Sequence, residues 1–98
     1  MIRVLLTAAA RADLVDAVAW YEAQAPEVAP QFVDAVSAAL RRIAENPKQF
    51  PPAALQTRRA LLRRFPYLVI FREHDEAVYI VAIFHTSRDP RIWRQRTT

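Results

Sequence analysis

The sequence has 98 residues, a formal net charge of +4, and neither cysteine nor glycine. This length predicts one domain, residues 1–98, since domains usually contain about 100–150 residues. The missing residue types exclude disulfides, cysteine-based zinc sites and the Gly-rich phosphate loops of NTPases and dinucleotide-binding enzymes, so we expect no cofactor and no metal.

The first half of the chain predicts a short strand followed by two amphipathic helices. Residues 2–6 are β-prone, and Thr7 is a suitable N-cap for a helix that starts at Ala8 and is stopped by Pro26. A second helix is predicted over residues 30–45, with proline in its first turn. The short break between them predicts an antiparallel hairpin that packs against an apolar surface. Apolar residues recur at helical spacing in both segments: Leu14, Val18 and Tyr21, then Phe32, Val36, Leu40 and Ile43.

The second half predicts a proline-rich loop, residues 46–57, and then three strands. These are RRALLRRF (58–65), YLVIFR (67–72) and AVYIVAIFH (77–85), with EHDE (73–76) as the turn between the last two. The last two strands are apolar on both faces, which is typical of central strands covered on both sides. The helices can cover one face, so the C-terminal tail or a partner must cover the other. The order β-α-α-β-β-β predicts an α+β fold, with the helical hairpin on one face of a mostly antiparallel sheet.

Basic residues concentrate in the second half of the chain. Residues 1–50 carry a net charge of −1, whereas residues 51–98 carry +5 and all nine of their basic residues are arginine. Arginine is suited to bidentate contact with carboxylates or phosphates, so this half indicates an anionic partner, with a solvated basic face as the alternative. The longest apolar run, residues 77–84, is far shorter than the roughly 20 residues that span a bilayer. We therefore expect a soluble, cytoplasmic protein with no membrane contact.

The most specific segment is FHTSRDPRIWRQR, residues 84–96, where an apolar strand ends in histidine and an Arg-Asp-Pro turn and a tryptophan follow. Together with ADLVDAVAWYE, QFVDAVSAALRRIAENP and FPYLVIFRE, it resembles the ParE/RelE superfamily of type II toxins over nearly the whole chain. The tail is similar to the ParE-like, plasmid-stabilisation branch. The resemblance implies a toxin neutralised, in a hetero-oligomeric complex, by a cognate ParD-like antitoxin encoded by an adjacent gene. It implies DNA gyrase as the target in ParE-like members, and mRNA cleavage on the ribosome in RelE-like members.

The residues must decide between a binder and an enzyme. RNA cleavage needs a base, an acid and cations that stabilise the charge growing on phosphorus. If the chain is a nuclease, its catalytic residues would be His85, Arg63, Arg64 and Arg88, and only His85 could exchange protons, because arginine stays protonated. RelE-like nucleases, as the resemblance implies, use a Lys and Arg array and a C-terminal tyrosine, but this sequence has no lysine cluster and no tyrosine after Tyr79. We therefore predict gyrase inhibition by binding, with a ribosome-dependent mRNA endonuclease and a non-toxic binding module as alternatives.

Candidate contact residues for the target or the antitoxin come from the second half of the chain, because Trp and Arg dominate protein interfaces. An antitoxin segment would lie on the sheet face that the helices leave bare, and the arginines would select an acidic partner. We expect DNA contact only indirectly, through the antitoxin, since no helix-turn-helix is predicted. The candidates are Arg58, Arg59, Arg63, Arg64, Arg88, Arg91, Trp93, Arg94 and Arg96.

Some of these positions also have structural interpretations. His85 would be a hydrogen-bonded residue at a strand end, with Asp89 as its partner, and Asp89 would orient a neighbouring arginine. Trp93 would dock the tail on the fold. Trp20 and Tyr21 are expected in the core or between the helices.

Overall fold

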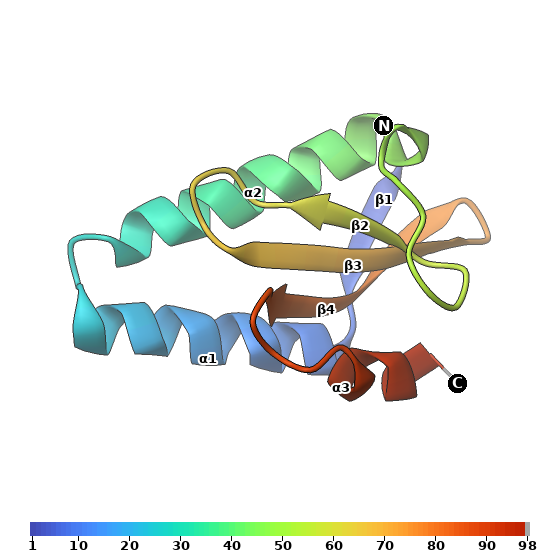
Figure 1. Cartoon of the computed structure of the whole chain (residues 1–98). Coiled ribbons are helices and arrows are strands. Elements are labelled where there is room, and N and C mark those ends of the chain that lie inside the picture. Colours follow the sequence, from blue (N-terminus) through green and yellow to red (C-terminus); the bar gives the residue numbers. More distant parts are fainter. Residues whose placement is uncertain (98) are drawn as a thin grey trace.

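The computed structural model describes residues 1–97 and confirms the predicted α+β fold, with a short helix added in the tail (Figure 1). The strands are β1 (Arg3–Leu6), β2 (Arg58–Leu61), β3 (Tyr67–His74) and β4 (Ala77–His85). The helices are α1 (Ala8–Gln24), α2 (Ala29–Glu45) and α3 (Arg91–Arg94), with 3-10 turns at Pro47–Gln49 and Gln95–Thr97. None of the helices within residues 1–97 combines the length and apolarity that crossing a membrane requires.

The strands form one mixed sheet in the order β1-β4-β3-β2. β1 runs parallel to β4, whereas β3 is antiparallel to both of its neighbours, β4 and β2. The β3–β4 hairpin is tighter than the predicted four-residue turn, because Glu73 and His74 still pair with Val78 and Ala77. Asp75 and Glu76 have φ values of 49° and 63°, the positive values that a two-residue hairpin turn requires.

The strand predicted over residues 58–65 is wrong in its second half. β2 ends at Leu61, and the chain then turns toward β3. Arg64 has φ 67°, in the left-handed region, which is incompatible with an extended strand. Arg63 and Arg64 therefore do not continue the row begun by Arg58 and Arg59.

The first helix begins where predicted. Thr7 is extended (φ −67°, ψ 162°), and its Oγ1 accepts a hydrogen bond of 3.1 Å from the amide of Ala10, as an N-cap does. The same hydroxyl donates to the carbonyl of Ile80 at 2.9 Å, so the start of α1 is fixed to β4. α1 and α2 form the predicted hairpin and cover one face of the sheet (Figure 1).

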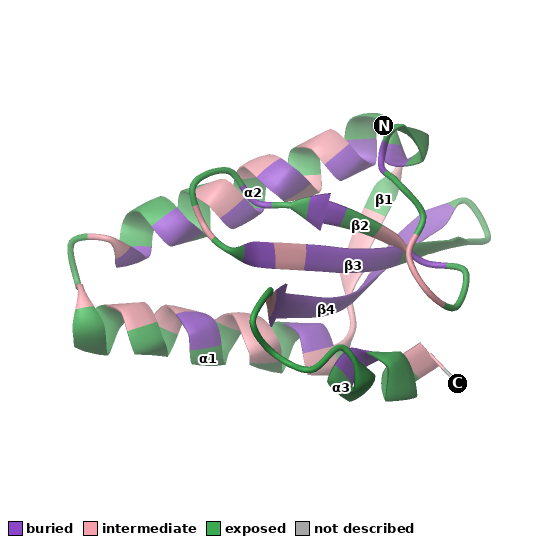
Figure 2. Cartoon of the chain, viewed as in Figure 1, coloured by how far each residue is buried: buried purple, intermediate pink, exposed green. Residues whose placement is uncertain are grey.

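The main core lies between this hairpin and the sheet, and Figure 2 shows the buried segments concentrated there. Tyr21 packs against Phe32 and Tyr67, with ring centroids 4.9 and 6.4 Å apart, as expected of a core residue. The same expectation is wrong for Trp20, which is 55% exposed. The largest fully buried core residues are Phe32, Ile43, Val69, Phe71, Val78 and Ile80.

The opposite face of the sheet carries a smaller apolar cluster. Ile70, Val81, Ala82 and Phe84 form it, and Trp93 from α3 lies on it with only 4% of its surface exposed. The prediction that Trp93 docks the tail is therefore confirmed. Ala53 and Ala54, in the loop before β2, also pack against this cluster.

A bulge in β4 determines toward which face of the sheet the last side chains of this strand point. Ile70 pairs with Ala82 and Phe71 pairs with Ile80, so Val81 has no partner on β3. Before the bulge, Val78 and Ile80 face the helices; after it, Ile83 does, and Phe84 faces away. The bulge therefore turns His85, two residues after Ile83, toward the helical side of the sheet.

Candidate functional site

The candidate arginines of β2 and of the turn after it lie in separate surroundings. Arg58 lies 3.5 Å from the carboxylate of Glu73 and donates to the carbonyl of Phe50 at 2.7 Å. Arg59 donates to the carbonyl of Pro52 at 2.7 Å. Arg63 and Arg64 instead line a hollow of about 470 Å³ beside α2. These four arginines therefore do not make one basic strip.

The arginines of the tail stabilise the turn and α3. Arg91 donates to Asp89 from its side chain at 2.7 Å, and its backbone amide donates at 2.9 Å. These two hydrogen bonds, the side-chain one first, hold the pKa of Asp89 below its usual value. Asp89 thus orients a neighbouring arginine, as predicted. Arg94 stacks over the ring of Trp93, with its guanidinium carbon 5.8 Å from the centroid.

Arg96 joins the tail to α1 and β4. Its guanidinium makes two hydrogen bonds to Asp13, of 2.7 and 3.0 Å, and a third of 3.0 Å to the carbonyl of Val81. Asp13 also accepts the amide of Ile83 at 2.9 Å. β1 ends opposite Ile80, so these side chains satisfy backbone groups of β4 that the strand β1 does not reach. The hydrogen bond to Asp13 raises the pKa of Arg96.

Beside Trp93, the second face of the sheet is hollowed into a groove of about 330 Å³, which we call the second-face groove. Its walls are mostly apolar, and three exposed candidate arginines also line it. Of the residues predicted to contact a partner, this groove unites Arg59, Arg88, Trp93 and Arg94. The other lining residues are Ala53, Ala54, Leu68, Ile70, Phe84, Thr86 and Pro90.

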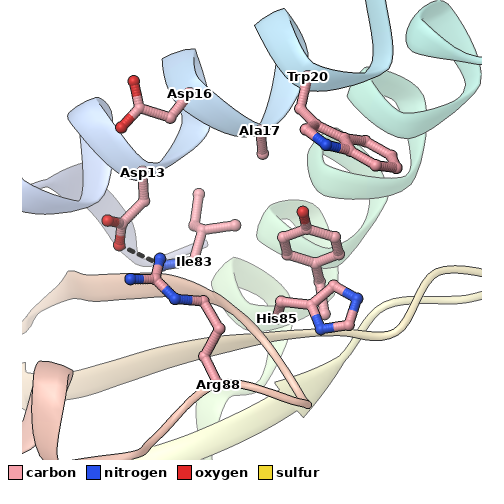
Figure 3. Close-up of a pocket in the computed structure, with 8 residues that line it drawn as sticks. Asp13, Asp16, Ala17, Trp20, Ile83, His85 and Arg88 are labelled. Carbon is pink, nitrogen blue, oxygen red and sulfur yellow. Dashed lines mark hydrogen bonds between the residues drawn. The ribbon is translucent and has the colours of Figure 1, made fainter. Parts of the chain in front are cut away.

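A second cleft, which we call the Trp20 cleft, opens between α1 and the end of β4. Figure 3 shows Asp16 and Trp20 from α1 on one side, and His85 and Arg88 on the other. It consists of two hollows of about 170 and 460 Å³, both lined by Trp20, Tyr67, His85 and Arg88. Arg88 lines the second-face groove as well, and its guanidinium makes no hydrogen bond or ion pair within residues 1–97. The exposure of Trp20 was not predicted, because its helix is apolar on several sides.

The ring of His85 is oriented by Ser87, so the predicted partner Asp89 is wrong. Nδ1 accepts the backbone amide of Ser87 at 3.0 Å and lies 2.7 Å from its hydroxyl. A backbone N–H can only donate, so Nδ1 presents a lone pair and the proton of the neutral ring lies on Nε2. In this geometry His85 presents an N–H donor rather than a base.

Tyr67 adds a second donor to the same cleft. Only 9% of its surface is exposed, its ring packs edge-on against His85 at 5.1 Å, and it lines both hollows. Burial raises the pKa of Tyr67, Tyr21 raises it further, and the charge of Arg88 opposes them. The hydroxyl therefore stays protonated near neutral pH, and within residues 1–97 it has no hydrogen-bond partner.

The four residues predicted for a nuclease do not come together. His85 and Arg88 share the Trp20 cleft, whereas Arg63 and Arg64 line the hollow beside α2. Among the residues that the structure describes, no three histidine, aspartate or glutamate side chains gather as a metal site.

Comparison with known proteins assigns the family. Residues 4–90 match the family described as the ParE toxin of the type II toxin-antitoxin system parDE. The chain belongs to the ParE toxin family. Its similarity to ParE relatives is substantial: Toxin ParE2 from two strains of Mycobacterium tuberculosis is 37% identical over an alignment of 82 residues, and the match covers 80% of this chain and 75% of the relative.

The ParE fold is also found in a solved structure. The structure described as a chromosomal ParDE TA system from P. aeruginosa matches with a TM-score of 0.78 and 23% identity, over 89% of this chain and 98% of that chain. The ParE family match ends at Pro90, so it includes all residues of the Trp20 cleft. Trp93, Arg94 and Arg96 lie beyond it.

Proposed function

We propose that this ParE family member is a toxin that inhibits DNA gyrase by binding it, and that a cognate antitoxin holds it inactive. The observation that carries the proposal is the match of residues 4–90 to the ParE toxin family. The names of its relatives, Toxin ParE2 and a ParDE system, agree with a toxin that works with an antitoxin. The partner would be a ParD-like protein encoded by an adjacent gene, and DNA contact would occur only through it.

The second-face groove is the proposed antitoxin site. An amphipathic antitoxin segment could place apolar side chains against Phe84 and Trp93 and acidic side chains on Arg59 and Arg94. This accounts for two features of the chain, its apolar second face and its surplus of arginine. Of the remaining predicted contact residues, Arg58, Arg91 and Arg96 form ion pairs within the chain. They therefore stabilise the structure around the groove rather than offer an unpaired positive charge to the antitoxin.

The tautomer of His85 supports binding without catalysis. General acid catalysis would require a proton on Nδ1, where the amide of Ser87 already donates at 3.0 Å. The cations needed at a cleaved phosphate lie in two separate places. Arg63 and Arg64 lie beside α2, and of the four predicted nuclease residues only Arg88 shares a cleft with His85. A binding surface needs no such alignment of proton donor, acceptor and cations.

The test uses the purified chain with gyrase and, separately, with ribosomes that carry mRNA. We expect it to inhibit supercoiling and to leave the mRNA intact, and addition of the adjacent gene product should restore supercoiling. Cleavage of the mRNA with full supercoiling would overturn the proposal.

The antitoxin site has its own test. Arg59→Glu should weaken the affinity for the antitoxin by about tenfold or more, which corresponds to roughly 1.4 kcal/mol. Arg63→Glu is the matched control, because it makes the same charge change outside the groove. Equal losses in the two variants would show that net charge, not the groove, governs affinity.

One observation favours a second candidate function, a ribosome-dependent mRNA endonuclease. His85, Tyr67 and Arg88 do share one cleft, and a nuclease could use them on a scissile phosphate. In that case His85→Ala should abolish toxicity and mRNA cleavage while the antitoxin affinity stays intact. Unchanged growth on expression without the antitoxin would instead indicate a non-toxic binding module.

A further inference from the structure

The Trp20 cleft presents hydrogen-bond donors that the chain itself leaves unused. The hydroxyl of Tyr67, which belongs to a side chain nine-tenths buried, has no partner within residues 1–97. The guanidinium of Arg88 has no hydrogen bond or ion pair there either, and the tautomer of His85 leaves Nε2–H as a donor. Donors from three side chains that line one cleft indicate a ligand with an acceptor such as a carboxylate.

The opposite wall of the cleft carries the opposite charge. The exposed carboxylate of Asp16 on α1 makes no hydrogen bond or ion pair within residues 1–97, whereas the carboxylate of Asp13 is neutralised by Arg96. The unpaired charged side chains that line the cleft are therefore one cation, Arg88, and one anion, Asp16. Nucleic acid backbones demand several cations along their path, and Asp16 would repel a phosphate. A polypeptide segment that carries its own acidic and basic groups fits this bipolar cleft better.

Trp20 supplies an apolar wall on the α1 side of the cleft (Figure 3). Its ring is 55% exposed and is held edge-on by Tyr21 at 5.1 Å, so it is fixed in position but not covered. A cleft lined by an exposed tryptophan and an arginine has the composition typical of interface hot spots. An apolar side chain next to the acidic one would bury the face of this ring.

We propose that the Trp20 cleft is the docking site for the toxin's target, and that it takes a polypeptide segment with a carboxylate for Arg88 and Tyr67 and an apolar side chain for Trp20. The inference rests on the proposed function, because it assumes that the chain is a toxin acting on a protein. It adds a site distinct from the second-face groove, where the antitoxin is proposed to lie.

Arg88 connects the two sites, since it lines both the Trp20 cleft and the second-face groove. One guanidinium cannot be aimed fully at a carboxylate in each. An antitoxin carboxylate that draws Arg88 into the groove therefore removes it from the cleft. The antitoxin then weakens target binding without having to cover the cleft.

The experiment measures toxicity and antitoxin affinity separately for the same variants. Toxicity is the expression level of the full chain that halts growth without the antitoxin, and affinity is the Kd of the purified chain for the antitoxin. Tyr67→Phe removes only the unpaired hydroxyl, and Trp20→Ala removes the exposed ring. We expect each to raise the halting level several-fold to about tenfold, as expected for a lost interface hydrogen bond or hot-spot ring, with Kd within about twofold of wild type.

Arg88→Gln should impair both readouts, because Arg88 serves both sites. Tyr79→Phe is the matched control for Tyr67→Phe, since it removes a hydroxyl from β4 outside the cleft, and it should change neither readout. Thermal melting of each variant checks folding, and Tyr67→Phe keeps the test valid if Trp20→Ala is poorly folded.

The outcomes separate the inference from the function on which it rests. If the wild type halts growth and the folded Tyr67→Phe and Trp20→Ala variants do so at the same level, the cleft proposal is overturned while the toxin assignment stands. Toxicity losses matched by equal losses of antitoxin affinity would also overturn it, because the cleft would then belong to the antitoxin site. A wild type without toxicity and without an antitoxin would refute the proposed function and the inference together. Binding of a short RNA that the same variants weaken would overturn the polypeptide ligand.

Discussion

The two faces of the sheet are closed by covers of very different size. One face is covered by α1 and α2, each of 17 residues, and its core continues from the helices into β3 and β4. The other face is covered by α3, which has four residues and one buried side chain, Trp93, and by Ala53 and Ala54 of the loop before β2. Apolar faces of a sheet must be shielded from water, but the segment that shields them need not be a large one. We infer that the first face determines whether the chain folds, whereas the small cover of the second face leaves room beside Trp93 for a partner.

The largest expected effect is on the first face. Phe32 is fully buried and packs against Tyr21, Phe65 and Tyr67, whose ring centroids lie 4.9–5.3 Å from its own. Phe32→Ala should cost about 3–5 kcal/mol, because the helices and sheet around it cannot collapse into the space. A domain this small has little more than that to lose, so urea unfolding should show a largely unfolded variant. Val33→Ala, at the exposed neighbouring position, is the control and should change stability by less than about 0.5 kcal/mol.

Trp93→Ala tests the second face. We expect a smaller loss, roughly 2–3 kcal/mol, because water replaces the ring at the surface and no rigid cavity remains. The variant should stay folded in urea titrations and bind more of a hydrophobic dye, since Phe84 and Ile70 lose their cover. A loss as large as that of Phe32→Ala would contradict the difference between the two covers. Ile92→Ala, in the same helix but 40% exposed, is the matched control.

The ion pair between Asp13 and Arg96 fastens the smaller cover to the rest of the fold. Both side chains are mostly buried, with 16% and 25% of their surfaces exposed. Asp13→Asn and Arg96→Gln should each cost about 1–2 kcal/mol, and the double variant should lose less than the sum, with a coupling of about 1 kcal/mol. Asp16→Asn, on the same helix but exposed, serves as the control. Strict additivity of the two changes would show that the pair does not hold the tail.

Residue patterns predicted the first face far better than the second. In α2, buried Phe32, Val36 and Ile43 alternate at helical spacing with exposed Asp34 and Arg41, and such a pattern determines both the helix and its orientation. In α1, alanine and valine occur on every side, so periodicity could not show that Trp20 faces solvent.

Both candidate sites depend on contacts that no local pattern shows. The bulge at Val81, which turns His85 toward the helical side, follows from pairing with β3 rather than from any residue near it. Asp13 and Arg96 are 83 positions apart, and only the finished fold brings them together. The end of β2 was missed because the residue in the left-handed conformation is Arg64, where glycine would have indicated a turn.

The β3–β4 turn belongs to neither face of the sheet. A substitution there should change the free energy of unfolding only slightly, so it shows how large a purely local effect is. Glu76 has φ 63°, a conformation that costs a residue with a Cβ atom some free energy. Glu76→Gly should therefore stabilise the fold by about 0.5–1 kcal/mol in urea unfolding. Glu76→Ala is the control, because it removes the same carboxylate but keeps the Cβ atom. An equal gain from alanine would assign the effect to charge rather than to backbone conformation.

The smallest effect concerns the exposed turn that leads into α3. Arg91 lowers the pKa of Asp89, so the ionised carboxylate favours the folded turn. That contribution is present above the ordinary pKa of aspartate and is lost as pH falls through the lowered value. Arg91→Gln should move the pKa of Asp89, followed by NMR of its carboxyl carbon, back toward the ordinary value, although the backbone amide at residue 91 still donates. Arg72→Gln, far from the turn, should leave it unchanged.

The same titration applied to Trp93→Ala sharpens the comparison of the two faces. If the pKa of Asp89 stays low in that variant, the turn is a local structure that persists when the tail leaves the sheet. The tail would then be a preformed unit that only the contacts of Trp93 and Arg96 hold on the sheet. If the pKa returns to its ordinary value, the turn forms only on the sheet. The groove wall formed by Pro90, Trp93 and Arg94 would then depend on the docking of one ring, so a change that loosens Trp93 should also weaken the binding of a partner in the groove.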